Sequence, residues 1–236
     1  VGVYDVASYG ILSFKGSEAG ETVIHRLDSG AQLTGSGVAS SIRGSQLQIN
    51  APLTLPISRI AIGTDGVLDL NADLTTTGRL EIYNSGTITG AGSLTTTGAF
   101  TWEGGAVGGA GVLTTQGNVT LAGGGVAENR QVVLERQWEM AGPVTVTGEI
   151  LTVALNAPLH IQSGQVFENK ALFGFTVSGT GRIDNDGVFR SSPGGANKVY
   201  VAMDTGAGGR VEVMEGTADF QNLLYLQGPS SSVGVY

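Results

Sequence analysis

Three consecutive segments of this chain repeat one pattern, and this repeat restricts the fold more than any other feature of the sequence. Residues 59–78 (RIAIGTDGVLDLNADLTTTG), 79–98 (RLEIYNSGTITGAGSLTTTG) and 99–117 (AFTWEGGAVGGAGVLTTQG) each end in Leu-Thr-Thr-x-Gly. A fourth copy begins at Asn118 and then diverges. A repeat of about 20 residues is too short for a helical hairpin or a propeller blade, but it accommodates three short strands joined by tight turns.

Within each copy, short bursts of apolar and polar residues alternate, as at 80–82 and 100–102. Period two indicates β-strands, and the Gly-rich stretches between the bursts are typical of turns. One such unit cannot bury its own inner face, so we expect the copies to stack as coils. Leu74, Leu94 and Leu113 then form a ladder along the axis, at about 4.8 Å per step.

These observations predict an all-β fold, namely a single right-handed parallel β-helix (β-solenoid) with about 20 residues per coil. The right hand follows from the statistics of crossover connections. We expect one continuous solenoid over residues 1–236, with a Greek-key sandwich as the alternative. Residues 127–138 also fit a helix, although QVVLE within them fits a strand in phase with its neighbours.

The two ends of the sequence match, because residues 1–4 and residues 233–236 both read VGVY. Reading the end into the start gives a strand, a turn and a strand without a break in phase. We therefore expect the segment to be one period of a longer repetitive protein. The alternative is that the match is a coincidence in a chain rich in Val and Gly. The open edges at the solenoid ends would then support end-to-end stacking of the protein on itself.

Composition excludes several classes of function. The 236 residues include 39 Gly, two His and no Cys, and the formal net charge is −8. Without Cys there is no thiolate metal site, disulfide scaffold or thiol nucleophile. The excess of acidic residues argues against nucleic acid as a partner. The sequence has no run of about 18 apolar residues, so we expect no transmembrane segment.

Two motifs carry a resemblance to a known class. Residues 102–111 read WEGGAVGGAG and residues 211–217 read VEVMEGT. With their surroundings, at about 74–124 and 210–220, they resemble large repetitive bacterial surface proteins, the filamentous-haemagglutinin and autotransporter-passenger class of β-helical adhesins. The resemblance implies an elongated protein that is extracellular or on the bacterial cell surface. It implies host or surface glycans or proteins as partners, and no defined ligand.

The strongest metal candidates are two carboxylates in the sequence RIDNDG. Asp184 and Asp186 lie two residues apart, and hard cations such as calcium bind several oxygens at one place. The distal Glu of an EF-hand loop is missing, and an ordinary Asx turn is the alternative. No other cofactor is expected. His25 and His160 lie in different coils, and we expect His160 to face outward between Leu159 and Ile161.

Some β-helical proteins cleave polysaccharides, so clustered acids need attention. Asp69 and Asp73, near Arg79 and Glu81, are the nearest candidates for such a site. These acids occupy polar positions at strand edges, where solvated carboxylates are ordinary. We therefore expect no enzymatic activity.

The threonines of the repeat suggest a ligand face. Residues 75–77, 95–97 and 114–115 are expected to stack on one side of the solenoid, as an array that orders water or simply as a β-branched strand surface. Trp138 is a candidate for stacking on a sugar, with burial in the core as the alternative. The candidates for a ligand face are Thr75, Thr77, Thr95, Thr97, Thr114 and Trp138.

The sequence as a whole predicts a structural or adhesive segment of a long secreted bacterial surface or filament protein. Its coils would form a stiff rod. The alternatives are a carbohydrate-active β-helical enzyme and a module that binds glycans or ice.

Overall fold

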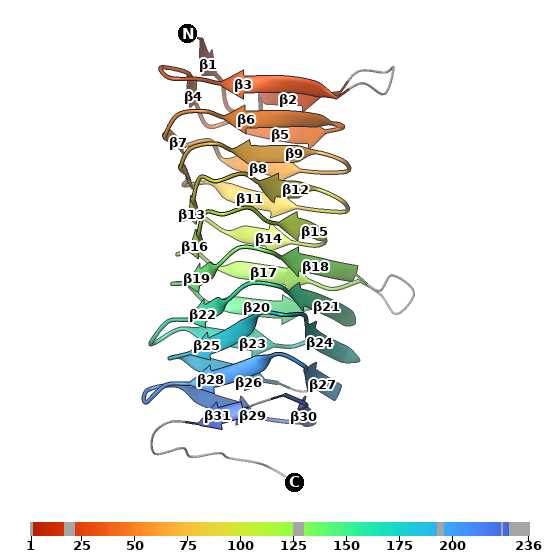
Figure 1. Cartoon of the computed structure of the whole chain (residues 1–236). Coiled ribbons are helices and arrows are strands. Elements are labelled where there is room, and N and C mark those ends of the chain that lie inside the picture. The colour runs from red at the N-terminus through yellow and green to blue at the C-terminus, as the bar shows by residue number, and fades with distance from the viewer. Residues whose placement is uncertain (1, 17–21, 125–129, 193–195, 223, 227–236) are drawn as a thin grey trace.

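The computed structural model describes residues 2–16, 22–124, 130–192, 196–222 and 224–226, and within these ranges the protein is all β. Three long parallel sheets run along the axis of a solenoid (Figure 1). Each complete coil contributes one strand to each sheet, in the order sheet 1, sheet 2, sheet 3. The parallel β-helix is confirmed, and the Greek-key sandwich is wrong because the long sheets are parallel. The coils average ~21 residues.

The strands of each sheet are separated in sequence by one coil. Sheet 1 contains β2 (Ile11–Lys15), β5 (Val38–Arg43), β8 (Arg59–Ile62), β11 (Arg79–Ile82), β14 (Phe100–Trp102), β17 (Val119–Ala122), β20 (Val144–Thr147), β23 (Val166–Asn169), β26 (Val188–Ser191) and β29 (Arg210–Val213). Sheet 2 contains β3 (Val23–Leu27), β6 (Ser45–Ile49), β9 (Val67–Leu70), β12 (Thr87–Thr89), β15 (Gly105–Val107), β18 (Arg130–Leu134), β21 (Ile150–Leu155), β24 (Gly174–Ser178), β27 (Ala196–Val199) and β30 (Thr217–Phe220). Sheet 3 contains β7 (Leu53–Leu55), β10 (Leu74–Thr76), β13 (Leu94–Thr96), β16 (Leu113–Thr115), β19 (Trp138–Met140), β22 (Leu159–Ile161), β25 (Arg182–Asn185), β28 (Ala202–Thr205) and β31 (Leu224–Leu226). At the N-terminal end, β1 (Val3–Asp5) pairs with β4 (Gln32–Thr34) as a separate parallel pair.

The predicted leucine ladder is confirmed. Leu74 is the register partner of Leu94, and Leu94 is the partner of Leu113. The same inward column continues through Trp138 and Leu159, so the stacking persists after the clear sequence repeat ends. Alternation along each strand turns these side chains into the interior, and their burial from water is the main stabilising contribution.

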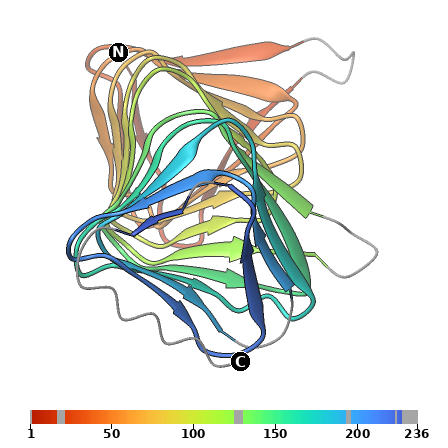
Figure 2. The same cartoon turned by 60° about the horizontal axis from the view of Figure 1, so that its bottom comes forward.

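The interior is one continuous apolar core that follows the axis. Viewed obliquely toward the C-terminal end, successive coils follow similar paths around a common centre (Figure 2). The buried rings of Phe100 and Trp102 are stacked with centroids 5.8 Å apart. Further along the axis, Phe167 and Phe189 are stacked at 5.3 Å. Offset aromatic pairs of this kind contribute packing energy beyond the area they bury.

Glycine ends each repeat because neighbouring coils approach closely at that corner. A Cβ placed on Gly98 would overlap the carbonyl oxygen of Gly78, and one on Gly117 would overlap that of Gly98. Gly therefore recurs at the end of Leu-Thr-Thr-x-Gly because this position in the coil has no room for a side chain.

One arginine is buried at the corner between sheets 2 and 3. Arg136 is 2% exposed, and its guanidinium donates hydrogen bonds to the carbonyl oxygens of Gly108 at 2.6 Å, Gly90 at 3.0 Å and Gly92 at 3.1 Å. Burial lowers the pKa of Arg136 below its ordinary value. The three carbonyls compensate part of the cost of removing this charge from water.

Several sequence predictions concern segments at the limits of the described residues. Of the helix and the strand considered within 127–138, the strand is confirmed and the helix is wrong where the structure describes them, because Arg130–Leu134 forms β18 and Trp138 begins β19. Residue 1 and residues 233–236, which carry the matching ends, lie outside the described residues. In the described ranges, no helix has the length and hydropathy that a membrane span requires.

Candidate functional site: the outer column of sheet 3

The outward side chains of sheet 3 form a column that begins with threonines. Thr75, Thr95 and Thr114 occupy the middle of β10, β13 and β16 and are register partners of one another. All three are partly exposed. The predicted stacking of these three candidates is therefore confirmed as geometry.

The other threonines of the repeat do not share this face. Thr76, Thr96 and Thr115 are fully buried, because they follow the outward threonine by one residue and strand alternation turns them inward. The prediction that all repeat threonines stack on one side is wrong for these three. Thr77 and Thr97 come directly after the strands and are exposed at the coil corner.

Trp138 does not present its ring to a ligand. It is 1% exposed, and its indole Nε1 donates a hydrogen bond to Thr115 Oγ1 at 2.9 Å. The ligand-face prediction for this residue is wrong because Trp138 is the register partner of Leu113 and takes the inward position of the leucine ladder.

Beyond Thr114 the outer column changes from hydroxyl to ionisable side chains. The register continues from Thr114 to Glu139 on β19, His160 on β22, Asp184 on β25 and Asp204 on β28. Because neighbouring strands in a sheet lie about 4.8 Å apart, these groups are held close together along the axis.

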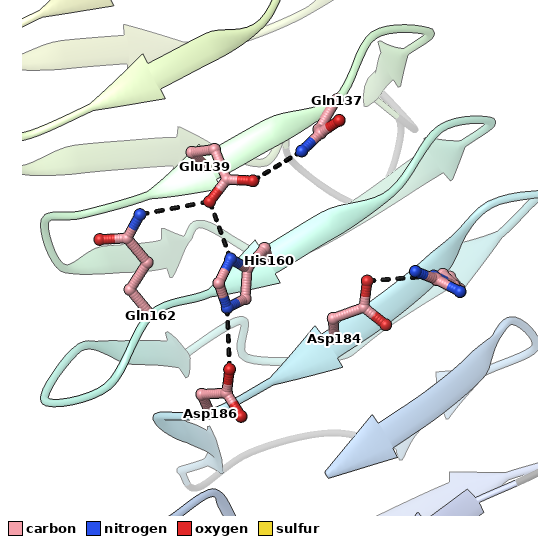
Figure 3. Close-up of polar contacts among 7 residues, drawn as sticks. Gln137, Glu139, His160, Gln162, Asp184 and Asp186 are labelled. Carbon is pink, nitrogen blue, oxygen red and sulfur yellow. Dashed lines mark hydrogen bonds and ion pairs between the residues drawn. The ribbon is translucent and has the colours of Figure 1, made fainter. Parts of the chain in front are cut away.

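His160 bridges carboxylates from the coils on either side of it (Figure 3). Its Nδ1 lies 2.8 Å from Glu139 Oε2, and its Nε2 lies 3.0 Å from Asp186 Oδ2. Glu139 belongs to the preceding coil and Asp186 follows β25 in the next coil. As predicted, His160 faces outward, and its side chain is 31% exposed.

Two glutamines hold Glu139 in place. Gln137 Nε2 donates to Glu139 Oε1 at 2.7 Å, and Gln162 Nε2 donates to Oε2 at 3.2 Å. Burial by itself opposes ionisation of Glu139. The hydrogen bonds from these glutamines and from His160, with the attraction of the imidazolium, outweigh burial and lower the pKa of Glu139 below 4.5.

The surroundings favour the charged form of His160. Burial by itself lowers the pKa of this imidazole, but hydrogen bonds to Asp186 and Glu139 and the charges of the two carboxylates outweigh it. The net effect raises the pKa of His160 above 6.5. The ring is therefore protonated over more of the near-neutral range than an unperturbed histidine.

The two predicted calcium ligands are engaged with different partners. Asp184 Oδ2 accepts a hydrogen bond from Arg182 Nε at 3.0 Å, whereas Asp186 faces His160. Among the residues the structure describes, no group of three or more His, Asp or Glu side chains is arranged to hold a metal ion. The geometry gives no support for treating Asp184 and Asp186 as ligands of one cation.

The four candidates for a glycan-cleaving site lie at separate places around the coil. Asp69 is on sheet 2, where two glutamines of β6 donate to it at 2.8 and 3.1 Å. Asp73 lies before β10 and accepts a hydrogen bond from the backbone of the next coil at 2.8 Å. Arg79 and Glu81 form an ion pair of 3.0 Å on sheet 1. A single coil passes all three sheets, so neighbours in sequence are carried to different faces.

His25 is far from His160 along the axis. Its ring packs edge-on against Phe14 in the first coils, with centroids 5.2 Å apart. Glu139 was not predicted as the partner of His160. Aligning the alternation of Trp-Glu-Met in 138–140 with Leu-Thr-Thr in 113–115 would have placed Glu139 in the threonine column.

Sheet 1 carries a second charged column, made of paired residues of opposite sign. Glu168, Arg190 and Glu212 are successive register partners. Arg190 Nε lies 2.7 Å from Glu212, and Arg190 Nη1 lies 3.9 Å from Glu168. Such a ladder links coils on the surface, where each exposed pair contributes about 0.2–1 kcal/mol.

Comparisons with known proteins found no match, so the functional argument rests on the geometry. No protein family, curated protein or solved structure matches the chain. The β-solenoid fold itself has a shape that is compatible with a rod.

Proposed function

We propose that this protein is a structural or adhesive rod segment of a long secreted protein of a bacterial surface or filament. The observation that carries this proposal is the continuity of three parallel sheets around one core (Figure 1). The backbone hydrogen bonds between coils run along the long axis, and every coil is packed against its neighbours. A bundle of three such ladders resists bending, because bending must open bonds on at least one face.

The outer columns suit this role. They are made of side chains that are satisfied by neighbours in adjacent coils, as in the ladders of sheets 1 and 3. We propose that they present hydroxyl and charged groups to host or surface glycans or proteins. The end coils would dock on further coils of the same kind. An enzymatic function is not part of the proposal, since the acids named as candidates lie on separate faces.

Two measurements test the proposal. Electron microscopy of the purified segment should show straight, unbending particles, and a flexible or jointed particle would contradict the rod. Antibodies against the segment should label intact cells of the producing organism as strongly as permeabilised cells. Labelling that requires permeabilisation would contradict the surface location while leaving the rod untouched.

A further inference from the structure

The bridging position of His160 links three successive coils of sheet 3 through one side chain. Glu139, His160 and Asp186 come from the coils of β19, β22 and β25 (Figure 3). The threonines of the same column in β10, β13 and β16 do not titrate in water. Among the described residues of this column, a connection that depends on a histidine proton therefore occurs only at His160.

The ring can hold both carboxylates only when it is protonated. An imidazolium has two N–H donors, and here one nitrogen faces Glu139 and the other faces Asp186. A neutral ring keeps one N–H and presents a lone pair at the other nitrogen. A lone pair directed at a carboxylate oxygen at about 3 Å is repulsive, so one of the two contacts must open.

The surroundings decide which contact opens. Glu139 is held by Gln137 and Gln162, and its side chain is 21% exposed. Asp186 is 51% exposed at the end of β25. The neutral ring therefore keeps its proton on Nδ1, toward Glu139, and releases Asp186 into solvent.

The other charged groups that face this cluster reinforce the need for the proton. Asp184 is the register partner of His160, and Asp204 is the register partner of Asp184. Arg182 is the basic residue on β25, and it is paired with Asp184. When the ring loses its charge, the acidic residues on or beside β19, β25 and β28 are left with Arg182 as their nearby cation among the described contacts.

We infer that His160 is a pH-sensitive clasp, which ties the coils of β19, β22 and β25 together while protonated and frees the coil of β25 when the ring becomes neutral. The inference goes beyond the proposed rod and does not depend on where the rod is located. Because the pKa of His160 is raised in the folded state, the clasp contributes its full stability below about pH 6.5. The contribution is lost as the pH rises through the raised pKa.

The first experiment is an NMR titration of the His160 ring in a His25→Gln background, which leaves one histidine signal, in buffer with EDTA and again with calcium. The clasp predicts that the pKa of His160 lies above 6.5, and that Asp186→Asn lowers it. Asp204→Asn is the matched control, since Asp204 lies in the same column without contacting the ring, and it should leave the titration nearly unchanged. A His160 pKa at or below 6.5, or equal effects of the two substitutions, would overturn the inference. A pKa that falls only when calcium is present would instead assign the carboxylates to a cation and also overturn it.

The second experiment measures amide hydrogen exchange of β22 and β25, corrected for intrinsic rates, between pH 6 and 9. In the wild-type protein the opening equilibrium should rise about fivefold over this range, the size expected for partly exposed charge pairs. The amides of β10 and β13, the strands that carry the threonine column, serve as the internal reference. His160→Gln should show the raised opening at every pH. A wild-type profile that is flat, or one that His160→Gln reproduces, would contradict the clasp.

Discussion

The coils of residues 59–117 and the coils of residues 130–205 share one backbone ladder but fill it differently. In the first region the outer column of sheet 3 is threonine at every step, as at Thr95. In the second it is Glu139, His160 and Asp184. The same parallel register therefore accepts either neutral or charged columns. The sheet 3 column of the first region should be insensitive to pH, and that of the second should not.

The interiors of the two regions also differ in the side chains that fill them. The first region repeats leucine at the inward position, and its coils have nearly constant length. In the second, the partner of Leu113 is Trp138, 25 residues later, and the stacked rings of Phe167 and Phe189 fill the core. The strands of sheet 2 are longer there, with six residues in β21 against three in β12, and large aromatic side chains occupy much of the wider interior. The Leu-Thr-Thr-x-Gly repeat is thus lost from the sequence of the second region, while its coils still stack in parallel register.

The largest effect should come from emptying the wider interior. Trp138→Ala should lower the free energy of unfolding by about 3–5 kcal/mol, because it removes a buried indole. Trp138→Leu installs the residue of the preceding coils and should recover only part of the loss, since leucine does not fill the wider coil. Urea unfolding of the two variants measures this. If Trp138→Leu were as stable as the wild type, coil width would not explain the difference between the regions.

A glycine at the tight corner of the first region should tolerate no side chain. Gly98→Ala forces a Cβ against the carbonyl of Gly78 and should cost about 3 kcal/mol. Gly174→Ala, in β24, is the matched control, because a Cβ there meets no atom within 4 Å. The control should be neutral or slightly stabilising, through the reduced entropy of the unfolded chain. Equal melting temperatures for the two variants would refute the close-approach argument.

The inner threonines should respond in opposite directions at the boundary between the regions. Thr115→Val leaves the buried Nε1 of Trp138 without its acceptor and should cost about 2 kcal/mol. Thr96→Val should instead stabilise the protein by about 1 kcal/mol, because Thr96 Oγ1 is buried and has no partner in the described part of the chain. Thermal unfolding decides the matter, and two changes of the same sign would count against it.

The smallest effect should be the loss of stability in acid when Glu139 of the charged column becomes protonated. Because its pKa is lowered in the folded state, Glu139 contributes stability above about pH 4.5, which is lost as the pH falls through the lowered pKa. Glu139→Gln should therefore cost about 1 kcal/mol at pH 6 and progressively less in acid. Thr114→Val, at the neighbouring position of the column, should have the same effect at every pH. A pH-independent cost for Glu139→Gln would show that its charge is not involved.

The fold was predictable where one residue type occupies each position of the coil. Leu94 marks the inward position of the coil, Thr95 the outward position and Gly98 the corner. The ladder of 59–117 follows from these three positions. The inward position of Thr96 also follows from strict alternation within Leu-Thr-Thr, although it was not predicted. A run of like residues hides which face each one occupies.

The bridging cluster was not predictable in the same way. Glu139 and Asp186 lie 21 and 26 residues from His160 in sequence. Coil length changes after Leu113, so no constant offset relates the three. Trp138 was considered for the surface for the same reason. Its inward position becomes evident only when its coil is aligned with the previous one.

The buried guanidinium of Arg136 bears on how such a chain can lengthen in evolution. Solenoids can grow by duplication or loss of single coils, because each coil contacts only its neighbours. Arg136 breaks that rule, since it donates to Gly108 one coil away and to Gly90 and Gly92 two coils away. Inserting or deleting a coil between them would remove these carbonyls from the reach of a buried cation, unless the new neighbour presents carbonyls at the same corner. The three coils that contain these residues are therefore coupled by one side chain, and they can be separated only by a coil whose corner supplies equivalent carbonyls.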